Sequence, residues 1–443
     1  MPASSATTRP TRRCTPRSSP CGAASTSSSQ GWGRPSFVPR PAGTAWSPFM
    51  SEEHATTPLP SKSVLDDVVD LRRHFHKHPE ISFSEHETTL YLKERLRELG
   101  VDLESGPTET GAVALLDTGR PGKTVMLRAD IDALPIQEES GVDFQSRIDG
   151  RMHACGHDAH MAIMIGVART LIDRISDLGG KYLFVFQPAE EIVEGAKAMI
   201  ARGLLDDHRP DAVIGLHIVS FMESGTVISR PGLMWSGSDA FDVSFSGPGG
   251  HGGMMGRRGN VLAAQAFFVE RLHTVVEGLE HEGVQCHTTI GNISSDGAWN
   301  IVPRGVLVQG SLRTFNDELR EQALDRMRDL LREAQSEFEV QSNLELVHGT
   351  VPLMNAPNVT RTVMEVGQEL IGDRASVLGR PLTVSDDFAE FLTRIPGCYF
   401  MLGARPEGDT PPAHHSPGFR IDEAALPVGV KVLAGAASRL AAE

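Results

Sequence analysis

The sequence has few cysteines and no long apolar run. Five cysteines occur in 443 residues, an odd and sparse set that suggests no disulfide framework. No uninterrupted apolar run approaches the roughly 20 residues that span a bilayer, and the start of the chain lacks the apolar core of a secretory signal. These absences predict a soluble protein with no membrane partner, in a reducing compartment that we expect to be the cytoplasm.

The first fifty residues contain no acidic side chain. They carry six arginines and are rich in Ser, Pro, Thr and Gly without apolar periodicity, so folding could not repay the entropy lost on ordering them. We expect residues 1–50 to be a disordered leader or a mis-assigned gene start, and the sequence around Met50 favours the second. The rest of the chain carries the excess of acid behind the net charge of −15, which argues against nucleic acid as a partner.

A dense group of metal-ligand side chains occupies residues 152–160, which read MHACGHDAH. Cysteine and histidine this close cannot share a helix face, but in a bend that enters a helix both can point at one ion. The alternative is a structural or redox cysteine beside solvated histidines. A second histidine-rich run, residues 74–80, contains Pro79 at a helix end, which favours a solvated turn.

Three short apolar runs of strand length each end in polar side chains. The first leads into Asp132, the second into Glu190 and Glu191, and the third into His217. Apolar runs separated by helical segments predict a mostly parallel sheet covered on both faces, with the site at the carboxyl ends of the strands. A solvated strand end is the ordinary alternative for any one carboxylate, but repetition across three strands favours a single crevice.

A change of pattern near residue 236 predicts a second domain. The alternation over residues 241–246 has a period of two, typical of a half-buried strand, and the helices and strands of an α+β unit follow. The prediction is an α/β catalytic domain over residues 51–235 and 351–443, interrupted by a lid domain over residues 236–350.

Six motifs, in order, resemble those of one enzyme family. They are the segment at residues 128–135, the 152–160 cluster, QPAEE at 187–191, GLH at 215–217, GGH at 249–251 and HSP at 415–417. The sequence is similar to the metallopeptidase-type amidohydrolases, which include hippurate hydrolases, aminoacylases and indoleacetyl-amino-acid hydrolases, with carboxypeptidase G more distant. The resemblance implies a zinc-peptidase-like three-layer catalytic domain with an inserted lid or dimerisation domain. It also implies hydrolysis of the amide bond of an N-acyl amino acid.

The resemblance further implies a site for two divalent metal ions, for which Zn, Mn, Co and Ni all suit the donor atoms. The family's ligands fall on Cys155, His157, Glu191, His217 and His415. His414 competes for the last position, and we prefer His415 because it directly precedes Ser-Pro.

Other residues match the family's reacting and supporting groups. Glu190 occupies the position of the family's general base. His251 matches a lid histidine of the family that donates a hydrogen bond to the developing oxyanion, sometimes from a partner subunit. Asn300 and Arg313 resemble residues that hold the substrate carboxylate, and Asp132 resembles one that orients a ligand from behind. The ordinary alternatives are a strand turn at His251, a turn at Asn300 and a surface cation at Arg313.

The chain also departs from the family pattern. Many relatives carry a second histidine after proline beyond His251, whereas this sequence reads GGMMGRR, so the substrate preference stays open. The run VSDDF at residues 384–388 has aspartate where relatives often carry glutamate, and this departure does not involve a proposed ligand.

Two other functions remain open. One is a dipeptidase or carboxypeptidase that uses the same groups on a peptide bond. The other is a non-catalytic metal-binding protein, against which Glu190 beside a full ligand set argues. A homo-oligomer formed through the lid domain is a further expectation.

Overall fold

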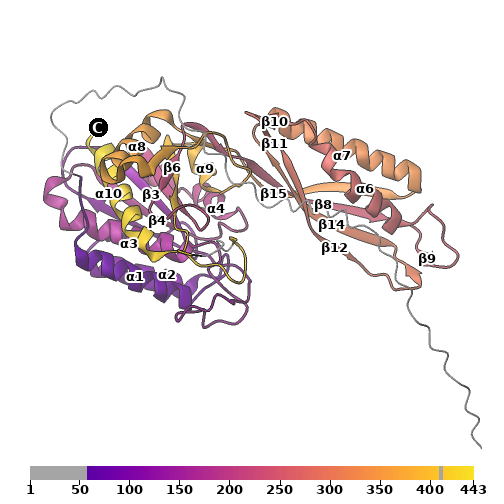
Figure 1. The fold of residues 1–443 in the computed structure, drawn as a ribbon, viewed down its shortest axis with the longest axis horizontal. Helices are drawn as coiled ribbons and strands as arrows, with labels where there is room; N and C mark the ends of the chain where they lie inside the picture. Colours follow the sequence, from indigo (N-terminus) through magenta and orange to yellow (C-terminus); the bar gives the residue numbers. More distant parts are fainter. Residues whose placement is uncertain (1–56, 409–412) are drawn as a thin grey trace, which may run out of the picture. The chain divides into compact units, whose positions relative to one another are not determined.

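The computed structural model describes residues 57–408 and 413–443 of the chain. The leader or gene-start segment predicted over residues 1–50 lies outside these residues. The described part contains a mixed eight-stranded sheet and an antiparallel four-stranded sheet inserted into its chain path (Figure 1). This α/β plan with an α+β insert confirms the predicted fold class.

The large sheet has the strand order β1-β2-β4-β3-β5-β18-β6-β17. Its neighbours are parallel from β4 through β3 and β5 to β18 and between β6 and β17, and antiparallel elsewhere. The carboxyl ends of β4, β3 and β5 therefore meet at one edge of the sheet. The strands are β1 (Asp102–Glu104), β2 (Ala112–Asp117), β3 (Thr124–Asp130), β4 (Lys181–Gln187), β5 (Ala212–Val219), β6 (Val227–Ser229), β17 (Ala375–Val377) and β18 (Gly397–Gly403).

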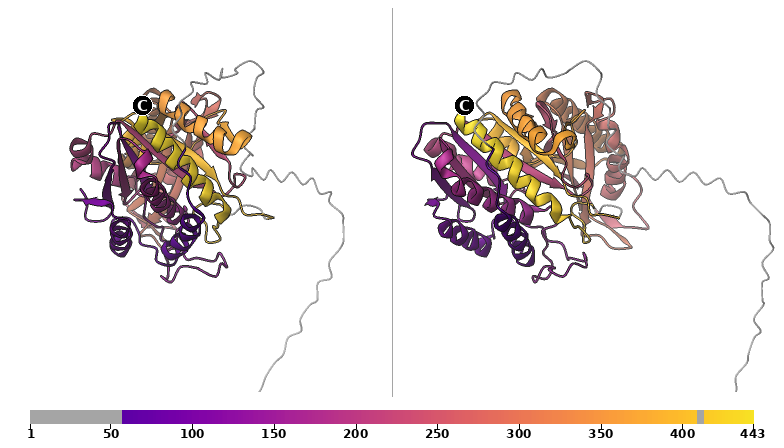
Figure 2. Two further views of the ribbon diagram at one scale, coloured as in Figure 1. Left: turned by 90° about the vertical axis from the view of Figure 1, so that its left-hand side faces the viewer. Right: turned by 60° about the vertical axis from the view of Figure 1, so that its left-hand side comes forward.

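Helices cover both faces of this sheet, each over an apolar core (Figure 2). One face carries α1 (Lys62–Lys77), α2 (His86–Glu98), α3 (His157–Asp173), α8 (Pro357–Ile371) and α10 (Leu426–Ala442). The other carries α4 (Gly195–Ala201), α5 (Leu204–His208) and α9 (Phe388–Leu392). The 3₁₀ turns are η1 (Ile175–Asp177), η2 (Gly372–Arg374) and η3 (Glu423–Ala425).

One segment, Glu423–Ala442, is long and apolar enough by length and composition to cross a membrane, but 72% of its most apolar 18-residue stretch is buried inside the structure. It contains α10, whose side chains belong to the apolar core. Burial of this kind is typical of the core helix of a soluble domain.

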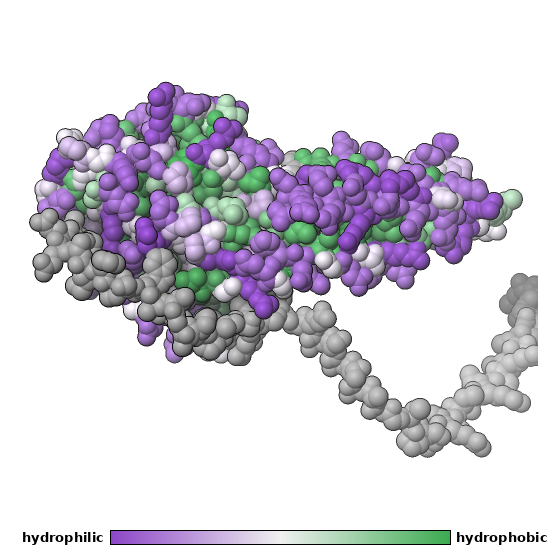
Figure 3. Space-filling model, turned by 90° about the horizontal axis from the view of Figure 1, so that it is seen from above, coloured by the Kyte–Doolittle hydropathy of each residue, from purple (hydrophilic) through white to green (hydrophobic). Residues whose placement is uncertain are grey.

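The second sheet has the order β12-β14-β8-β15, antiparallel throughout. Buried and partly exposed side chains alternate along β8, as the period of two predicts. Two helices pack on this sheet over a separate core, and the view in Figure 3 shows many hydrophilic side chains on the insert. Its elements are β8 (Gly237–Ser246), α6 (Val261–Val275), β12 (His287–Ser295), β14 (Gly305–Thr314), α7 (Asp317–Phe338) and β15 (Gln341–Thr350).

Three short strand pairs complete the fold. They are β7 (Gly232–Trp235) with β16 (Leu353–Asn355), β9 (Gly250–His251) with β13 (Ile301–Val302), and β10 (Glu280–His281) with β11 (Val284–Gln285). The domain limits at residues 235 and 350 stay a prediction.

The prediction of a solvated turn at residues 74–80 is wrong for His76. Helix α1 continues through Lys77, and this helix turns His76 inward, where it is 1% exposed. Its Nδ1 lies 2.8 Å from Asp158 and its Nε2 lies 3.0 Å from Glu138. The amphipathic period of α1, rather than Pro79, decides the burial of this side chain.

Candidate metal centre and active site

Cys155 and His157 flank a glycine bend at the start of α3. Gly156 has a φ of 96°, and a Cβ at this position would lie 2.4 Å from Cγ2 of Ile218, so only glycine fits without a shift of its neighbours. The bend directs Cys155 and His157 into one buried site. There the ligand atoms of Cys155, His157 and His217, which lies in β5, are all within 4.8 Å of one another.

A second group of three side chains shares Cys155. Its Sγ lies 3.4 Å from Nε2 of His217 and 3.4 Å from Nε2 of His415. Nε2 of His415 in turn lies 3.5 Å from Oε2 of Glu191, so Cys155, Glu191 and His415 form the second group. The five side chains predicted as ligands thus make two groups with the thiol in common.

Neighbouring histidines make other contacts. Nε2 of His414 accepts a hydrogen bond from the backbone N–H of Ser220 at 3.1 Å, and His414 belongs to neither group. His160 uses both ring nitrogens, Nδ1 with Asp130 at 2.6 Å and Nε2 with a backbone N–H at 2.9 Å. Because Nε2 of His414 is hydrogen-bonded to Ser220 whereas Nε2 of His415 lies 3.4 Å from the Cys155 thiol, His415 is the better candidate ligand.

Two buried polar atoms of the cluster have no hydrogen-bond partner among the described residues. They are Nε2 of His157 and Oε1 of Glu191, which lie 3.9 Å apart. A buried polar atom left unpaired costs about 1–3 kcal/mol. Thiolate, imidazole and carboxylate are the ligands that zinc and similar ions prefer, so these residues fit divalent metal ions.

Several acidic side chains lie close together at the cluster, away from solvent. Burial raises the pKa of Glu190 well above its ordinary value, and the carboxylates of Asp386 and Glu191 raise it further. Burial also raises the pKa of Glu191 to about 8. Burial alone would lower the pKa of His157, but Asp130 and other acids raise it to about 10. A divalent cation would offset this excess of negative charge.

Asp132 holds the turn that carries Glu190 and Glu191. Its Oδ1 accepts the N–H of Glu190 and its Oδ2 accepts the N–H of Glu191, each at 3.1 Å. The backbone carbonyl of Asp132 lies 2.8 Å from Nδ1 of His157. Hydrogen bonds of this kind, made by a residue that does not itself bind the metal, orient a metal ligand.

The insert carries three predicted site residues, His251, Asn300 and Arg313. Of these, Arg313 lies near Glu190 of its own chain. Its Nη1 donates to Oγ of Ser385 at 2.7 Å; burial lowers its pKa, and the charge of Glu190 raises it. His251 is exposed in β9, and Asn300 directly precedes β13, which pairs with β9. Within residues 57–408 and 413–443, no hydrogen bond or ion pair joins His251 or Asn300 to the cluster, so their roles stay predictions.

A buried charged network beside Glu190 was not found from the sequence. Arg128 donates to Asp130 at 2.7 Å and to Asp387 at 2.8 Å, and it pairs with Asp386 at 3.1 Å. Carboxylate oxygens of Glu190, Asp386 and Asp387 all lie within 4.8 Å of one another. The available signal was the pair of opposite charges two residues apart in β3, which puts both on one face of the strand.

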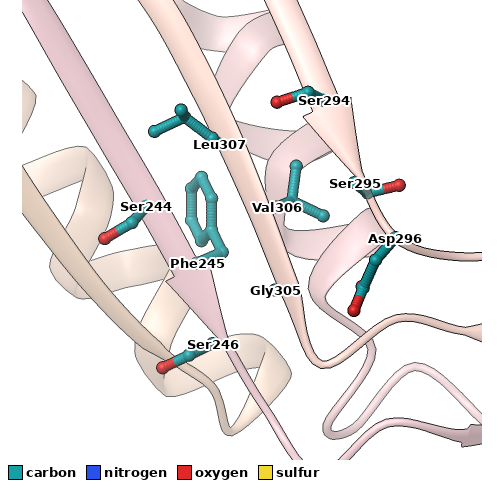
Figure 4. Close-up of a pocket in the computed structure, with 9 residues that line it drawn as sticks. All are labelled: Ser244, Phe245, Ser246, Ser294, Ser295, Asp296, Gly305, Val306 and Leu307. Atoms are coloured by element: carbon teal, nitrogen blue, oxygen red, sulfur yellow. The ribbon is translucent and has the colours of Figure 1, made fainter.

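A separate cavity of about 570 Å³ lies at the ends of β8, β12 and β14. Nine residues line it (Figure 4): Ser244, Phe245, Ser246, Ser294, Ser295, Asp296, Gly305, Val306 and Leu307. It contains none of the predicted site residues and no imidazole or thiol, so the chemistry described above does not extend to it.

A family model described as peptidase family M20/M25/M40 matches residues 126–439, a span that includes the whole ligand cluster. The chain belongs to this family. This M20 chain is 32% identical to the N-acetyl-L-cysteine deacetylase of Bacillus subtilis (strain 168), over 87% of this chain and 91% of the relative. It is 34% identical to thermostable carboxypeptidase 2 of Saccharolobus solfataricus, over 83% of this chain and 94% of the relative.

A solved structure has the same fold. It is a dinuclear metal-binding peptidase of family M20 from Bacillus subtilis, with a TM-score of 0.72 and 28% identity over 86% of this chain and 99% of that one. The relatives are hydrolases that act on amide bonds. Membership of the M20 family thus supports metal-dependent hydrolysis of an amide bond.

Proposed function

We propose that this M20 chain is a metal-dependent amidohydrolase that cleaves the amide bond of N-acyl amino acids. One observation carries the proposal: five candidate ligand side chains from distant parts of the chain converge on one cluster, in which Cys155 and His157 are buried and His415 is exposed. The Glu190 carboxylate lies at the edge of this cluster. The similarity to a deacetylase of an N-acetylated amino acid supports this substrate class.

The two groups that share Cys155 are the proposed holders of two divalent ions. His157 and His217 complete one group, and Glu191 and His415 complete the other. When bound, two such ions supply Lewis acidity, which polarises the amide carbonyl and lowers the pKa of water. Zn, Mn, Co and Ni all suit these donors, so the metal is left open.

The chain's own residues move the proton and hold the substrate. Glu190 takes a proton from the water that attacks the carbonyl carbon, and it delivers that proton to the amine as the carbon–nitrogen bond breaks. Its buried place among the carboxylates of Asp386 and Glu191 favours holding that proton between the two steps. Arg313 binds the substrate carboxylate through a charge-assisted hydrogen bond.

His251 and Asn300 need a partner for their proposed roles, because among the described residues no hydrogen bond or ion pair joins either of them to the cluster of its own chain. We assign His251 to the oxyanion and Asn300 to the substrate carboxylate, contributed across a homo-oligomer formed through the lid domain (residues 236–350). The exposed edge strand β12 offers unpaired backbone groups for such an assembly. Light scattering of the purified chain tests this, and the mass of a single chain would contradict it.

A second candidate is a carboxypeptidase that acts on a peptide bond, which the similarity to thermostable carboxypeptidase 2 favours. Only the side of the site that receives the acyl group would differ. We place either enzyme in the cytoplasm, because the free thiol of Cys155 is best preserved in a reducing compartment.

A substrate panel tests the proposed function. Metal-reconstituted protein is given N-acetyl, N-benzoyl and longer N-acyl amino acids, matched dipeptides, and N-acyl amino acid amides that lack the carboxylate. We expect N-acyl amino acids to reach a kcat/KM of about 10⁴ M⁻¹s⁻¹ or more, and the amides to show a raised KM. Faster cleavage of dipeptides would favour the carboxypeptidase, and no hydrolysis with both metals bound would favour a non-catalytic protein.

A further inference from the structure

Glu85 is a buried carboxylate that the proposed reaction does not use. It lies directly before α2, and its side chain is fully buried. A short polar side chain such as that of aspartate often caps the first turn of a helix from this position, but Glu85 makes no such hydrogen bond. Glu80 does so instead, accepting the N–H groups of Glu87 at 3.3 Å and Thr88 at 2.8 Å. The burial of Glu85 therefore needs another explanation.

The side chain of Glu85 reaches the turn that carries Glu190. Its Oε1 accepts the N–H of Ala189 at 2.9 Å. Ala189 has a φ of 55°, a left-handed conformation that residues with a side chain adopt only when their surroundings enforce it. The next two N–H groups, those of Glu190 and Glu191, bond to Asp132. Two carboxylates thus hold three consecutive backbone amides.

Residues 80–82, which shortly precede Glu85, also hold Asp132 in place. Oγ of Ser82 donates to Oδ2 of Asp132 at 2.6 Å, and the backbone carbonyl of Glu80 accepts the N–H of Ala133 at 2.8 Å. Burial, together with the nearby charge of Asp132, raises the pKa of Glu85 to about 7. Near neutral pH the uncharged amide of glutamine is therefore a close substitute for this side chain.

We propose that Glu85 is a positioning residue, which fixes the left-handed turn at Ala189 and so sets the directions in which Glu190 and Glu191 point into the cluster. The inference rests on the proposed function, in which Glu190 is the general base. Among its described contacts, Glu85 touches no proposed metal ligand, and its effect passes through the backbone of Ala189. A misplacement of about 1 Å at a reacting group can lower a rate by about 10²-fold.

Three variants of the full-length, metal-reconstituted protein test this. Glu85→Leu leaves the Ala189 N–H without its acceptor, Glu85→Gln keeps an acceptor, and Glu80→Gln alters the neighbouring helix cap without touching the turn. We expect Glu85→Leu to lower kcat about 100-fold with little change in KM, while the other two stay within about threefold of the unaltered protein.

Amide hydrogen exchange of a peptide spanning residues 187–195, followed by mass spectrometry, is the measurement that does not depend on activity. We expect faster exchange of this peptide in Glu85→Leu, with and without metal, and unchanged exchange in Glu85→Gln and Glu80→Gln. The proposal is overturned if Glu85→Leu keeps its kcat or its exchange rate, or if Glu85→Gln loses as much activity as Glu85→Leu.

Failure of the proposed function, failure of the proposed role of Glu85 and misfolding of a variant can be told apart. If the unaltered protein hydrolyses no N-acyl amino acid, the proposed function fails, whereas the exchange measurement still decides whether Glu85 holds the turn. If Glu85→Leu does not fold, Glu85→Asp replaces it, because its carboxyl group is one methylene too short to reach Ala189. Unchanged exchange and kcat in Glu85→Asp would then overturn the proposal.

Discussion

Arg128 is a fully buried guanidinium surrounded by three aspartates. Removal of one partner from a buried ionic network leaves the remaining charges without compensation, which costs about 3–5 kcal/mol. We therefore expect Arg128→Met to lower the free energy of unfolding by about this amount in urea titrations.

Arg169→Met is the matched control for this change. Arg169 pairs with Asp173 on the exposed surface of α3, where both side chains are more than 40% accessible, and such pairs contribute about 0.5 kcal/mol or less. Equal losses in the two variants would show that the network beside Glu190 has no special contribution to stability.

At the scale of single residues, the sequence predicts side chains whose chemistry is concentrated in short motifs. Cys155 and His157 lie in one such motif, and Glu190 and Glu191 in another. Glu85 and Asp386 could not be assigned in this way, because their partners are distant in the sequence and a lone carboxylate is usually solvated. Their positions follow only from the packing of α2 and α9 against the sheet.

At the scale of elements, the glycine bend before α3 determines where two proposed ligands point. We expect Gly156→Ala to lower the free energy of unfolding by about 1–3 kcal/mol more than a positive φ alone would, since the added Cβ would lie 2.4 Å from Ile218. The displaced Cys155 and His157 should also bind less metal. Metal analysis and thermal unfolding measure the two effects.

Gly150→Ala is the control for the backbone conformation alone. Gly150 also has a positive φ, of 71°, but a Cβ there would have no neighbour within 4 Å, so we expect a loss of about 1–2 kcal/mol and no change in metal content. If Gly156→Ala kept its full metal content, the bend would not be what positions the ligands.

Helices and strands were predictable where one period dominates the pattern. The strand expected near residues 241–246 is part of β8, and its alternation is visible in the burial of its side chains. The burial of His76 was missed because a histidine-rich run before a proline looks polar, whereas α1 turns this ring toward Asp158 and Glu138. Local composition does not reveal a buried ion pair formed with distant elements.

At the scale of the whole molecule, the site exists only because β3, β4 and β5 are neighbours in the large sheet. Their order brings Asp132, the turn after β4 and His217 to one place, and the loop that carries His415 closes the group. Sequence patterns predict such a crevice through the rule for parallel strands. They do not predict the antiparallel pairing of β1 with β2 or of β18 with β6, which depends on tertiary packing.

We propose that Glu190 carries the proton of the attacking water while the five proposed ligand side chains hold the metal ions. Glu190→Gln, measured beside the unaltered protein on the best N-acyl amino acid of the panel and with metal content determined in both, tests this most directly. The account predicts a fall in kcat of about 10²- to 10⁴-fold with unchanged metal content. A kcat equal to that of the unaltered protein, at equal metal content, would contradict it.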